Sequence, residues 1–499
     1  MLKQQLYKYF GYSSFRPGQE EVVSSILAGK DTLAMLPTGT GKSLCFQLPG
    51  YIMDGSVVII SPLLSLMQDQ VEQMRKRGEK RVIAINSFLS PIEKKEALAK
   101  LPYYKFIFLS PEMLTLPFII DRLREVTISL LAIDEAHCIS QWGYDFRPDY
   151  LKLGDFRQRL GNPLTLALTA TATIDIREDI VNRLEMNNPV RIVSSVDRPN
   201  ISFHIEKLGD YREKERRILE LVGTLKRPGI IYFSSKRAAE QTAAMLRSKG
   251  FSRTMPYHGG MDQEQRILIQ QQFLNSQLDI ICATSAFGMG VDKEDIRFVI
   301  HYHMPMQIES YLQEIGRAGR DGEPSLAILL YAEGDDFLQY NLAEGELPSG
   351  EQLDAFFSYL KMGELKKDQN AIFEHAREAG GLTDTQWRWL KDALDSFGGE
   401  NLQKVLEELK SYVANRNRIK VNYIHKMKGI IDHDECIRNY FLDYFQEPSL
   451  EIGRYNCCDK CGLQLTDFMG EIIAEKKAEI NMDWKKHLSF LLLGEVNEK

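Results

Sequence analysis

Short apolar runs alternate with helix-compatible segments along the first two thirds of the chain. One set of runs lies at residues 57–60, 106–109, 130–133 and 165–168, and a second set lies at residues 229–233, 280–283, 298–301 and 326–330. Apolar runs without polar alternation are typical of strands that are buried on both faces, and strands that alternate with helices form parallel sheets. The pattern predicts an α/β protein with two parallel-sheet lobes in tandem, at residues 1–205 and 206–345, and a break near residues 197–200.

The pattern changes after the second set. Residues 333–354 contain seven acidic residues and no Lys or Arg, which is typical of an exposed linker. Residues 346–430 have mostly helical periodicity and are predicted to form a helical insertion or linker. We expect a cysteine-containing subdomain at residues 431–470 and a C-terminal tail at residues 471–499.

The composition is that of a soluble globular protein with several domains. The chain has 499 residues, of which 44% are hydrophobic and 26% are charged, and a single core stops growing well below this length. The N-terminus has no apolar signal core, and no run approaches eighteen apolar residues. We therefore expect a cytoplasmic protein, nucleoid-associated if bacterial, with no membrane partner. In that compartment its seven cysteines are expected to be metal ligands or buried thiols.

The charge distribution leaves nucleic-acid binding open. The net charge of -7 argues against a general polyanion binder. Residues 411–429, however, contain no acidic residue. They include two tyrosines and five basic residues, which are Tyr412, Tyr423, Arg416, Arg418, Lys420, Lys426 and Lys428. This run is compatible with a solvated helix face and also with a nucleic-acid contact.

A short segment between a predicted strand and a predicted helix has the pattern of a phosphate-binding turn. Its core consists of Thr38, Gly39, Thr40, Gly41, Lys42 and Ser43. The two glycines let backbone amides turn towards phosphate oxygens, and the helix N-terminus adds partial positive charge. Lys42 would reach the β- and γ-phosphates of ATP, and the Ser43 hydroxyl would ligate Mg²⁺. Leu36 replaces the first glycine of the full pattern, so a glycine-rich turn with a solvated lysine is the alternative.

Two acidic residues follow the apolar run at residues 130–133. Asp134 and Glu135 are therefore expected at the carboxyl end of a strand, where α/β sheets bind their ligands. Asp134 could hold Mg²⁺ through water, and Glu135 could polarise the water that attacks a phosphate. The alternative is an acidic pair that caps a helix.

A third group of residues could supply positive charge. Gln313, Gly316, Arg317 and Arg320 lie at positions i, i+3, i+4 and i+7, so a helix would present them on one face. Across a cleft, the two arginines could act as arginine fingers, an effect worth on the order of 10³ to 10⁵ in rate. The second lobe has no glycine-lysine turn of its own, which suggests a single ATP site between the lobes. A surface helix paired with acids is the alternative.

The order of these elements resembles the RecQ family of superfamily-two DNA helicases, over residues 1 to about 330 and again from about 431 to 465. The resemblance implies two RecA-like lobes followed by a helical zinc-binding region. It also implies an ATP-dependent, 3′ to 5′ helicase that acts on single-stranded and partially duplex DNA in recombination and repair. By the same resemblance Tyr12 would stack on adenine, Gln19 would hydrogen-bond its edge and Arg16 would approach the phosphates.

Several segments are similar to the family's strand-contacting and coupling motifs, including those that contain Ser61 and Thr284 and the segment at residues 169–171. The stretch most particular to the family is the aromatic loop at residues 138–148, which contains Trp142, Phe146 and Arg147. Exposed aromatic side chains can stack on unpaired bases, at roughly 1 to 3 kcal/mol per base. The loop would then report DNA occupancy to Glu135. A buried aromatic turn is the alternative.

Four cysteines near the C-terminal end suggest a metal site. Cys436, Cys457, Cys458 and Cys461 match the family's zinc ligands, and four thiolates suit tetrahedral Zn²⁺. The adjacent pair departs from the usual spacing, so the alternative is a site that has lost its metal. The remaining three cysteines are expected to be packed thiols.

The sequence also predicts a short form of the family. Too few residues follow Cys461 for the winged-helix and C-terminal helical domains of many relatives. We expect a monomer, and the sequence identifies no protein partner. Two rival functions remain open: an RNA helicase, and an ATP-gated nucleic-acid binding or annealing factor that does not unwind duplexes.

Overall fold

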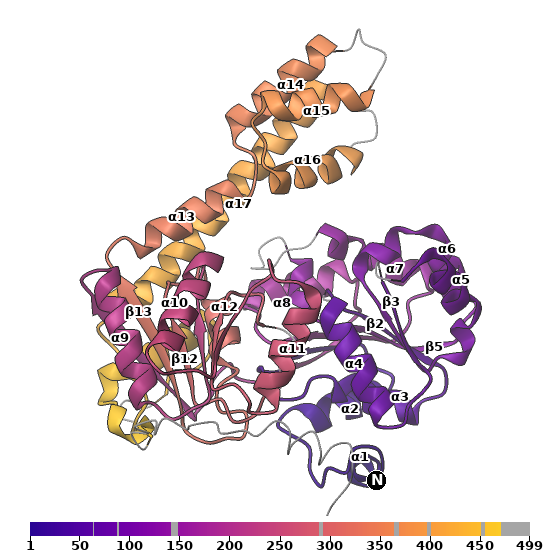
Figure 1. Cartoon of the computed structure of the whole chain (residues 1–499). Coiled ribbons are helices and arrows are strands. Elements are labelled where there is room, and N and C mark those ends of the chain that lie inside the picture. Colours follow the sequence, from indigo (N-terminus) through magenta and orange to yellow (C-terminus); the bar gives the residue numbers. More distant parts are fainter. Residues whose placement is uncertain are drawn as a thin grey trace, which may run out of the picture.

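The computed structural model describes residues 1–62, 64–86, 89–140, 148–288, 293–363, 369–396, 401–450 and 455–470. Figure 1 shows two α/β lobes beside each other and a helical arm that extends away from the second lobe. Within the described residues, no helix is both long enough and apolar enough to cross a membrane.

The first lobe is built on a seven-stranded parallel sheet in the order β3-β4-β2-β5-β6-β1-β7. The strands are β1 (Thr32–Met35), β2 (Ser56–Ile60), β3 (Val82–Ile85), β4 (Phe106–Leu109), β5 (Ile128–Ile133), β6 (Thr165–Thr169) and β7 (Val190–Val193). The helices are α1 (Leu2–Phe10), α2 (Gln19–Leu27), α3 (Leu44–Ile52), α4 (Leu64–Lys76), α5 (Pro91–Ala99), α6 (Pro117–Arg124), α7 (Leu153–Arg159) and α8 (Ile174–Arg183). The central strands β1, β2, β4 and β6 are buried along their whole length, as their continuous apolar sequences predict.

The second lobe is a six-stranded parallel sheet in the order β10-β11-β9-β12-β13-β8. Its strands are β8 (Ile201–Leu208), β9 (Gly229–Tyr232), β10 (Thr254–Tyr257), β11 (Ile280–Ala283), β12 (Phe298–His301) and β13 (Ser325–Ala332). Its helices are α9 (Tyr211–Thr224), α10 (Lys236–Ser248), α11 (Gln263–Leu274) and α12 (Ile308–Ile315). The predicted fold class of two parallel-sheet lobes is confirmed. Because β8 pairs with β13, the second sheet begins at Ile201, a few residues before the expected boundary at residue 205.

The helical arm follows β13. It contains α13 (Asp335–Gly345), α14 (Gly350–Gly363), α15 (Gln369–Ala379), α16 (Asp384–Ser396) and α17 (Leu402–Asp432). Helices α13 and α17 run side by side from the second lobe to a small bundle formed by α14, α15, α16 and the start of α17 (Figure 1). The bundle has its own buried core, which includes Leu353, Phe356, Phe357, Leu390 and Val405.

The acidic segment at residues 333–354 is not an exposed linker, and this prediction is wrong. Most of the segment is helical, and its first two aspartates are buried. Asp335 forms an ion pair with Lys214, and both side chains are fully buried. Asp336 accepts a hydrogen bond of 2.5 Å from Lys428. The acids are therefore paired with basic residues that are far away in the sequence, which a local count of charges does not reveal.

The cysteine-containing region packs against the second lobe. It consists of α18 (Ile437–Tyr444) and the short 3₁₀ helices η5 (Asp459–Cys461) and η6 (Leu465–Phe468). Isolated bridges join Cys458 to Phe203 of β8, and Met469 to Leu225. The region is thus attached at the start of the second lobe, next to the junction between the lobes.

Candidate functional site

The glycine turn lies between β1 and α3, as the sequence predicts. Gly39 and Gly41 have φ angles of 86° and 71°, in the left-handed region that residues with a side chain rarely adopt. A Cβ atom added to Gly39 would lie 3.0 Å from Cγ of Arg320, which belongs to the second lobe. Glycine at this position therefore permits both the turn and the close approach of the opposite lobe.

Residues near the N-terminus hold this turn in place. Gln19 is buried, and its amide nitrogen donates hydrogen bonds to the carbonyls of Thr40 (2.6 Å) and Gly41 (3.1 Å). The Arg16 guanidinium donates to the Gly39 carbonyl. Tyr12 is half exposed, so its ring has a solvent-facing surface. The roles of these residues towards adenine and phosphate stay predictions, and Gln19 would have to exchange its present partners to contact a base.

The acidic pair follows β5 at the carboxyl edge of the first sheet. Glu135 is buried and has a left-handed backbone with φ 47°. His137 connects it to β6, because its Nδ1 lies 3.4 Å from Glu135 Oε2 and 2.9 Å from Thr169 Oγ1. Burial and the neighbouring Glu135 charge raise the pKa of Asp134, and the positive charge of Lys42 opposes this rise. Two crowded carboxylates beside a lysine are a suitable environment for a divalent cation.

Groups from both lobes line one cleft with a volume of about 160 Å³. The first lobe contributes Thr38, Gly39, Gly41, Lys42, Ser43, Asp134 and Glu135, and the second lobe contributes Gln313, Arg317 and Arg320. The structure therefore brings together the phosphate-binding turn, the acidic pair and the candidate arginine fingers. Helix α4 adds Leu66, Asp69 and Gln70, which belong to the same motif-like segment as Ser61, and Gln73, which the sequence did not single out.

Residues 316–320, here called the arginine segment, form a turn and not the helix that the sequence predicts. Helix α12 ends at Ile315, so Arg317 and Arg320 lie in the turn that follows and not on a helical face. Arg317 is buried and donates a hydrogen bond to the Gly288 carbonyl. A Cβ atom on Gly316 would lie 2.7 Å from Thr38 Oγ1, so a side chain there would push the two lobes apart. The expectation of one helical face is wrong, although its members do converge.

Arg198 is a site residue that the sequence analysis missed. Its Nη1 donates to the carbonyls of Thr38 (3.1 Å) and Gly316 (2.9 Å). Its Nη2 donates to the carbonyls of Ala318 (3.1 Å) and Gly319 (2.8 Å). Burial, and then the charge of the nearby Arg320, lower the pKa of Arg198 to about 10, which still leaves it charged at neutral pH. One guanidinium therefore joins the phosphate-binding turn to the arginine segment.

Arg438 of α18 fixes the backbone at Arg198. Its side chain is almost fully buried and forms an ion pair with Asp197. It also donates hydrogen bonds to the carbonyls of Arg198 (3.1 Å) and Ile201 (2.5 Å). Its Nε lies 3.3 Å from Cys457 Sγ. The junction between the lobes is thereby attached to the cysteine cluster.

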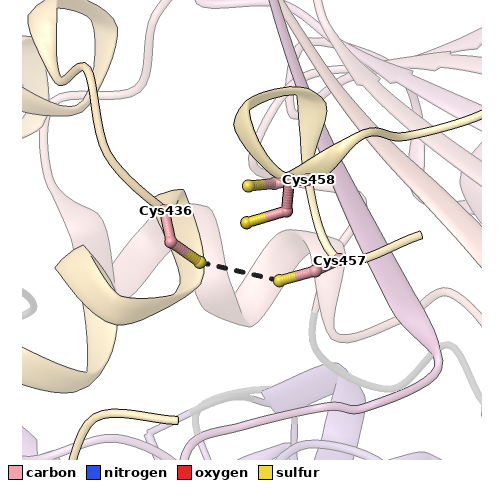
Figure 2. Close-up of side chains that lie close together, drawn as sticks. Cys436, Cys457 and Cys458 are labelled. Carbon is pink, nitrogen blue, oxygen red and sulfur yellow. Dashed lines mark hydrogen bonds between the residues drawn. The ribbon is translucent and has the colours of Figure 1, made fainter. Parts of the chain in front are cut away.

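The four late cysteines come together. The sulfur atoms of Cys436, Cys457, Cys458 and Cys461 all lie within 4.8 Å of one another. Figure 2 shows the sulfurs of Cys436 and Cys457 facing each other, at 3.6 Å. Four thiolates around Zn²⁺ at about 2.3 Å would lie roughly 3.8 Å apart, so the cluster has the size and donor set of such a site. The adjacent Cys457 and Cys458 both point into it, and the other three cysteines are buried elsewhere.

The predicted DNA contacts are only partly described. Ser61 follows β2 and is buried, and Thr284 follows β11 and is partly exposed. Trp142, Phe146 and Arg147 lie outside the described residues. The chain is described again from η4 (Pro148–Lys152), where the Tyr150 hydroxyl donates to the Asp134 carbonyl at 3.0 Å. The segment after the aromatic loop is thus attached to the acidic pair.

Comparisons with known proteins show which families the chain resembles. Residues 16–180 match the DEAD/DEAH box helicase family, and residues 213–322 match the helicase conserved C-terminal domain. The chain is 45% identical to a probable ATP-dependent DNA helicase RecS of Bacillus subtilis, with 99% of each chain covered. It is 41% identical to the ATP-dependent DNA helicase RecQ of Pasteurella multocida over 66% of this chain and 52% of the relative. The chain thus spans about half the length of that second relative.

Solved structures show the same fold. The Mycobacterium smegmatis helicase Lhr, bound to single-stranded DNA and AMP-PNP, matches with a TM-score of 0.55 and 21% identity, over 76% of this chain and 55% of that one. The DEAD-box helicase Mss116, bound to single-stranded RNA, matches with a TM-score of 0.56 and 15% identity, over 85% of this chain and 90% of that one. At these identities the likeness extends to the fold alone.

Arg198 can be tested as a positioning residue. We expect Arg198→Ala and Arg198→Lys both to lower kcat for ATP hydrolysis at least tenfold, with a smaller change in KM, because neither side chain can bond four carbonyls at once. Arg191→Ala is the matched control, since Arg191 is exposed and its side chain forms an ion pair with Glu178 of the first lobe. Normal turnover by Arg198→Lys would show that charge alone suffices and that the four bonds are unnecessary.

Proposed function

The chain belongs to the RecQ family of ATP-dependent DNA helicases, and on this premise we propose that it moves 3′ to 5′ along single-stranded DNA and unwinds duplexes. The observation that supports this most directly is the cleft lined by both lobes. A nucleotide in that cleft would touch the turn of one lobe and the arginines of the other, so its hydrolysis would change how the lobes meet. The direction of movement, and a role in recombination and repair, rest on the resemblance to the family.

The residues of the cleft have distinct roles in this proposal. Lys42 and the amides of the turn bind the β- and γ-phosphates of ATP, and Glu135 orients the attacking water. Arg317 and Arg320 neutralise the charge that develops on the transferred phosphate. Gln313 helps to position the γ-phosphate in the cleft. Bound Mg²⁺, held by Ser43 and by Asp134 through water, would polarise the phosphate oxygens. Binding of ATP thus closes the lobes, and loss of the γ-phosphate releases them.

The proposed contacts with nucleic acid rest on the resemblance to the family. Single-stranded and partially duplex DNA would run over motifs that contain Ser61 and Thr284, and the aromatic side chains of Trp142 and Phe146 would stack on unpaired bases, with Arg147 beside them. Tyr150, which bonds the Asp134 carbonyl, gives this loop a connection to the acidic pair. The protein would act as a cytoplasmic monomer.

Zinc is proposed for the cysteine cluster. Its four sulfurs lie within 4.8 Å of one another, which suits a tetrahedral thiolate site, and Arg438 donates to Cys457 Sγ. Zinc there would fix α18 to the 3₁₀ helix η5 and would keep Arg438 in place at the junction of the lobes. The role is structural, because all four ligand positions come from the protein.

An unwinding assay tests the proposed function. Duplexes with a 3′ tail, a 5′ tail or blunt ends, together with an RNA duplex, are incubated with ATP and Mg²⁺. We expect strand separation of the 3′-tailed DNA alone. Unwinding of RNA only, or annealing without unwinding, would replace the proposal with one of its rivals.

A substitution of Arg317 should affect nucleotide hydrolysis and leave nucleotide binding largely unchanged. We expect Arg317→Ala to bind a fluorescent ATP analogue with little change and to lower kcat on the order of 10³-fold, because the finger acts on charge that develops only in the transition state. Arg212→Ala, an exposed arginine on the same lobe, is the control. Hydrolysis at the parent rate would remove the assignment of Arg317 as a finger.

Metal content tests the cysteine cluster. The purified parent is expected to contain about one equivalent of zinc, and Cys461→Ser is expected to lose most of it and to melt at a lower temperature. Cys45→Ser is the control, since Cys45 is a buried thiol of the first lobe and its replacement should affect stability without affecting metal content. A parent protein free of zinc would contradict the proposal.

A further inference from the structure

A second groove, with a volume of about 660 Å³, lies at the junction of the lobes. None of its lining residues belongs to the nucleotide cleft. One wall is the start of α8 in the first lobe, and the other is formed by α12 of the second lobe with α17 and α18. The groove therefore spans both lobes and the base of the helical arm.

Four basic residues of α17 form two groups with different surroundings. Lys420 and Lys428 form ion pairs with Glu346 and Asp336, respectively, so they join α17 to the neighbouring acidic segment. Arg418 and Lys426 are exposed and line the groove, with Asn422 between them. These three positions are four residues apart, so they lie on one face of the helix with a rise of about 6 Å between neighbours. The groove thus has a row of donors along one wall.

The facing wall also offers donors. Thr173 caps the N-terminus of α8, and its side chain makes no capping hydrogen bond to the helix. The first amides of this ten-residue helix add partial positive charge at the same end. Two acids line the groove as well. Asp175 is exposed, whereas Glu309 is fully buried and accepts a hydrogen bond of 2.6 Å from the Tyr444 hydroxyl. Burial raises the pKa of Glu309.

Both walls lead directly to catalytic groups. Thr173 lies four residues after Thr169, whose hydroxyl contacts His137 beside Glu135. On the other wall, Glu309 lies in the first turn of α12, and Arg317 follows the end of this helix. A ligand that touched both walls would therefore contact elements that lead to both halves of the nucleotide cleft.

We propose that this groove binds the backbone of a single DNA strand, with Arg418 and Lys426 contacting alternate phosphates, about 12 Å apart along the helix, and Asn422 and Thr173 donating hydrogen bonds beside them. The inference rests on the proposed function and adds a path for the strand along the helical arm. Donors on a helix at intervals of about 6 Å suit an extended strand, since phosphate contacts need charge and reach but no base readout. Because the strand would lie against both lobes, movement of the lobes would act on it directly.

Salt-dependent binding tests the groove. The double variant Arg418→Ala with Lys426→Ala is compared with Lys404→Ala and Lys410→Ala combined, which removes two lysines from the same helix outside the groove. Affinity for a short labelled oligothymidylate is measured at several salt concentrations without nucleotide. Each lost phosphate contact on a single strand lowers the slope of log K against log salt by about 0.7. We expect the groove variant to bind several-fold more weakly at low salt with a slope smaller by about 1.4, and the control to match the parent.

A further variant and a stability measurement complete the test of the groove. The charge-preserving pair Arg418→Lys with Lys426→Arg should restore most of the slope, and melting temperatures should show that the variants are folded. An unchanged slope in the groove variant, or an equal decrease in the control, would overturn the groove proposal while leaving the helicase assignment intact. Failure of the parent protein to bind the oligonucleotide would instead overturn the proposed function.

Discussion

The arrangement of the two lobes depends on the four hydrogen bonds of Arg198. Backbone carbonyls are obligatory acceptors, and this guanidinium satisfies one on the phosphate-binding turn and three on the arginine segment. All four partners are main-chain atoms, so the contact fixes the backbones themselves. Lys42, Glu135 and Arg317 can act on one phosphate only if those backbones meet in a defined register. Arg198 supplies that register from the connection between the lobes, where a small rotation has the largest effect on the cleft.

Arg198 is held in turn by a second arginine, and this links the cysteine cluster to the cleft. A buried guanidinium costs several kcal/mol unless it is paired and hydrogen-bonded. Arg438 meets both conditions, with Asp197 as its carboxylate partner and with backbone carbonyls and the ring of Phe203 around it. Its Nε also faces Cys457 Sγ. A change at the four cysteines would therefore reach the cleft through Arg438 and Arg198.

The sequence predicted the parts of the molecule that depend on local patterns. Strands buried on both faces have continuous apolar sequences, so β4 and β11 were located to the residue. The phosphate-binding turn was found because its positive φ angles require glycine. Predictions failed where pairing is long-range. The acids of α13 looked solvated because their partner Lys214 lies more than a hundred residues away in the sequence. No local sequence pattern marks Arg198, apart from its position in the predicted break between the two lobes. Edge strands such as β7, with alternating burial, were also missed.

The groove and the cleft are connected by short, stiff elements, and this limits how they can communicate. Helix α12 has eight residues and a length of about 12 Å, with Glu309 near one end and Gln313 facing the cleft. On the first lobe, Glu135 adopts a left-handed backbone that costs about 1–3 kcal/mol and persists only because its surroundings hold it. His137 and Thr169 are part of those surroundings, and Thr169 lies at the end of β6, which leads to the groove. A shift of the strand end by a fraction of an ångström would alter the support of Glu135, whereas a long flexible connection would absorb it. Coupling between a bound strand and hydrolysis therefore needs no large movement within either lobe.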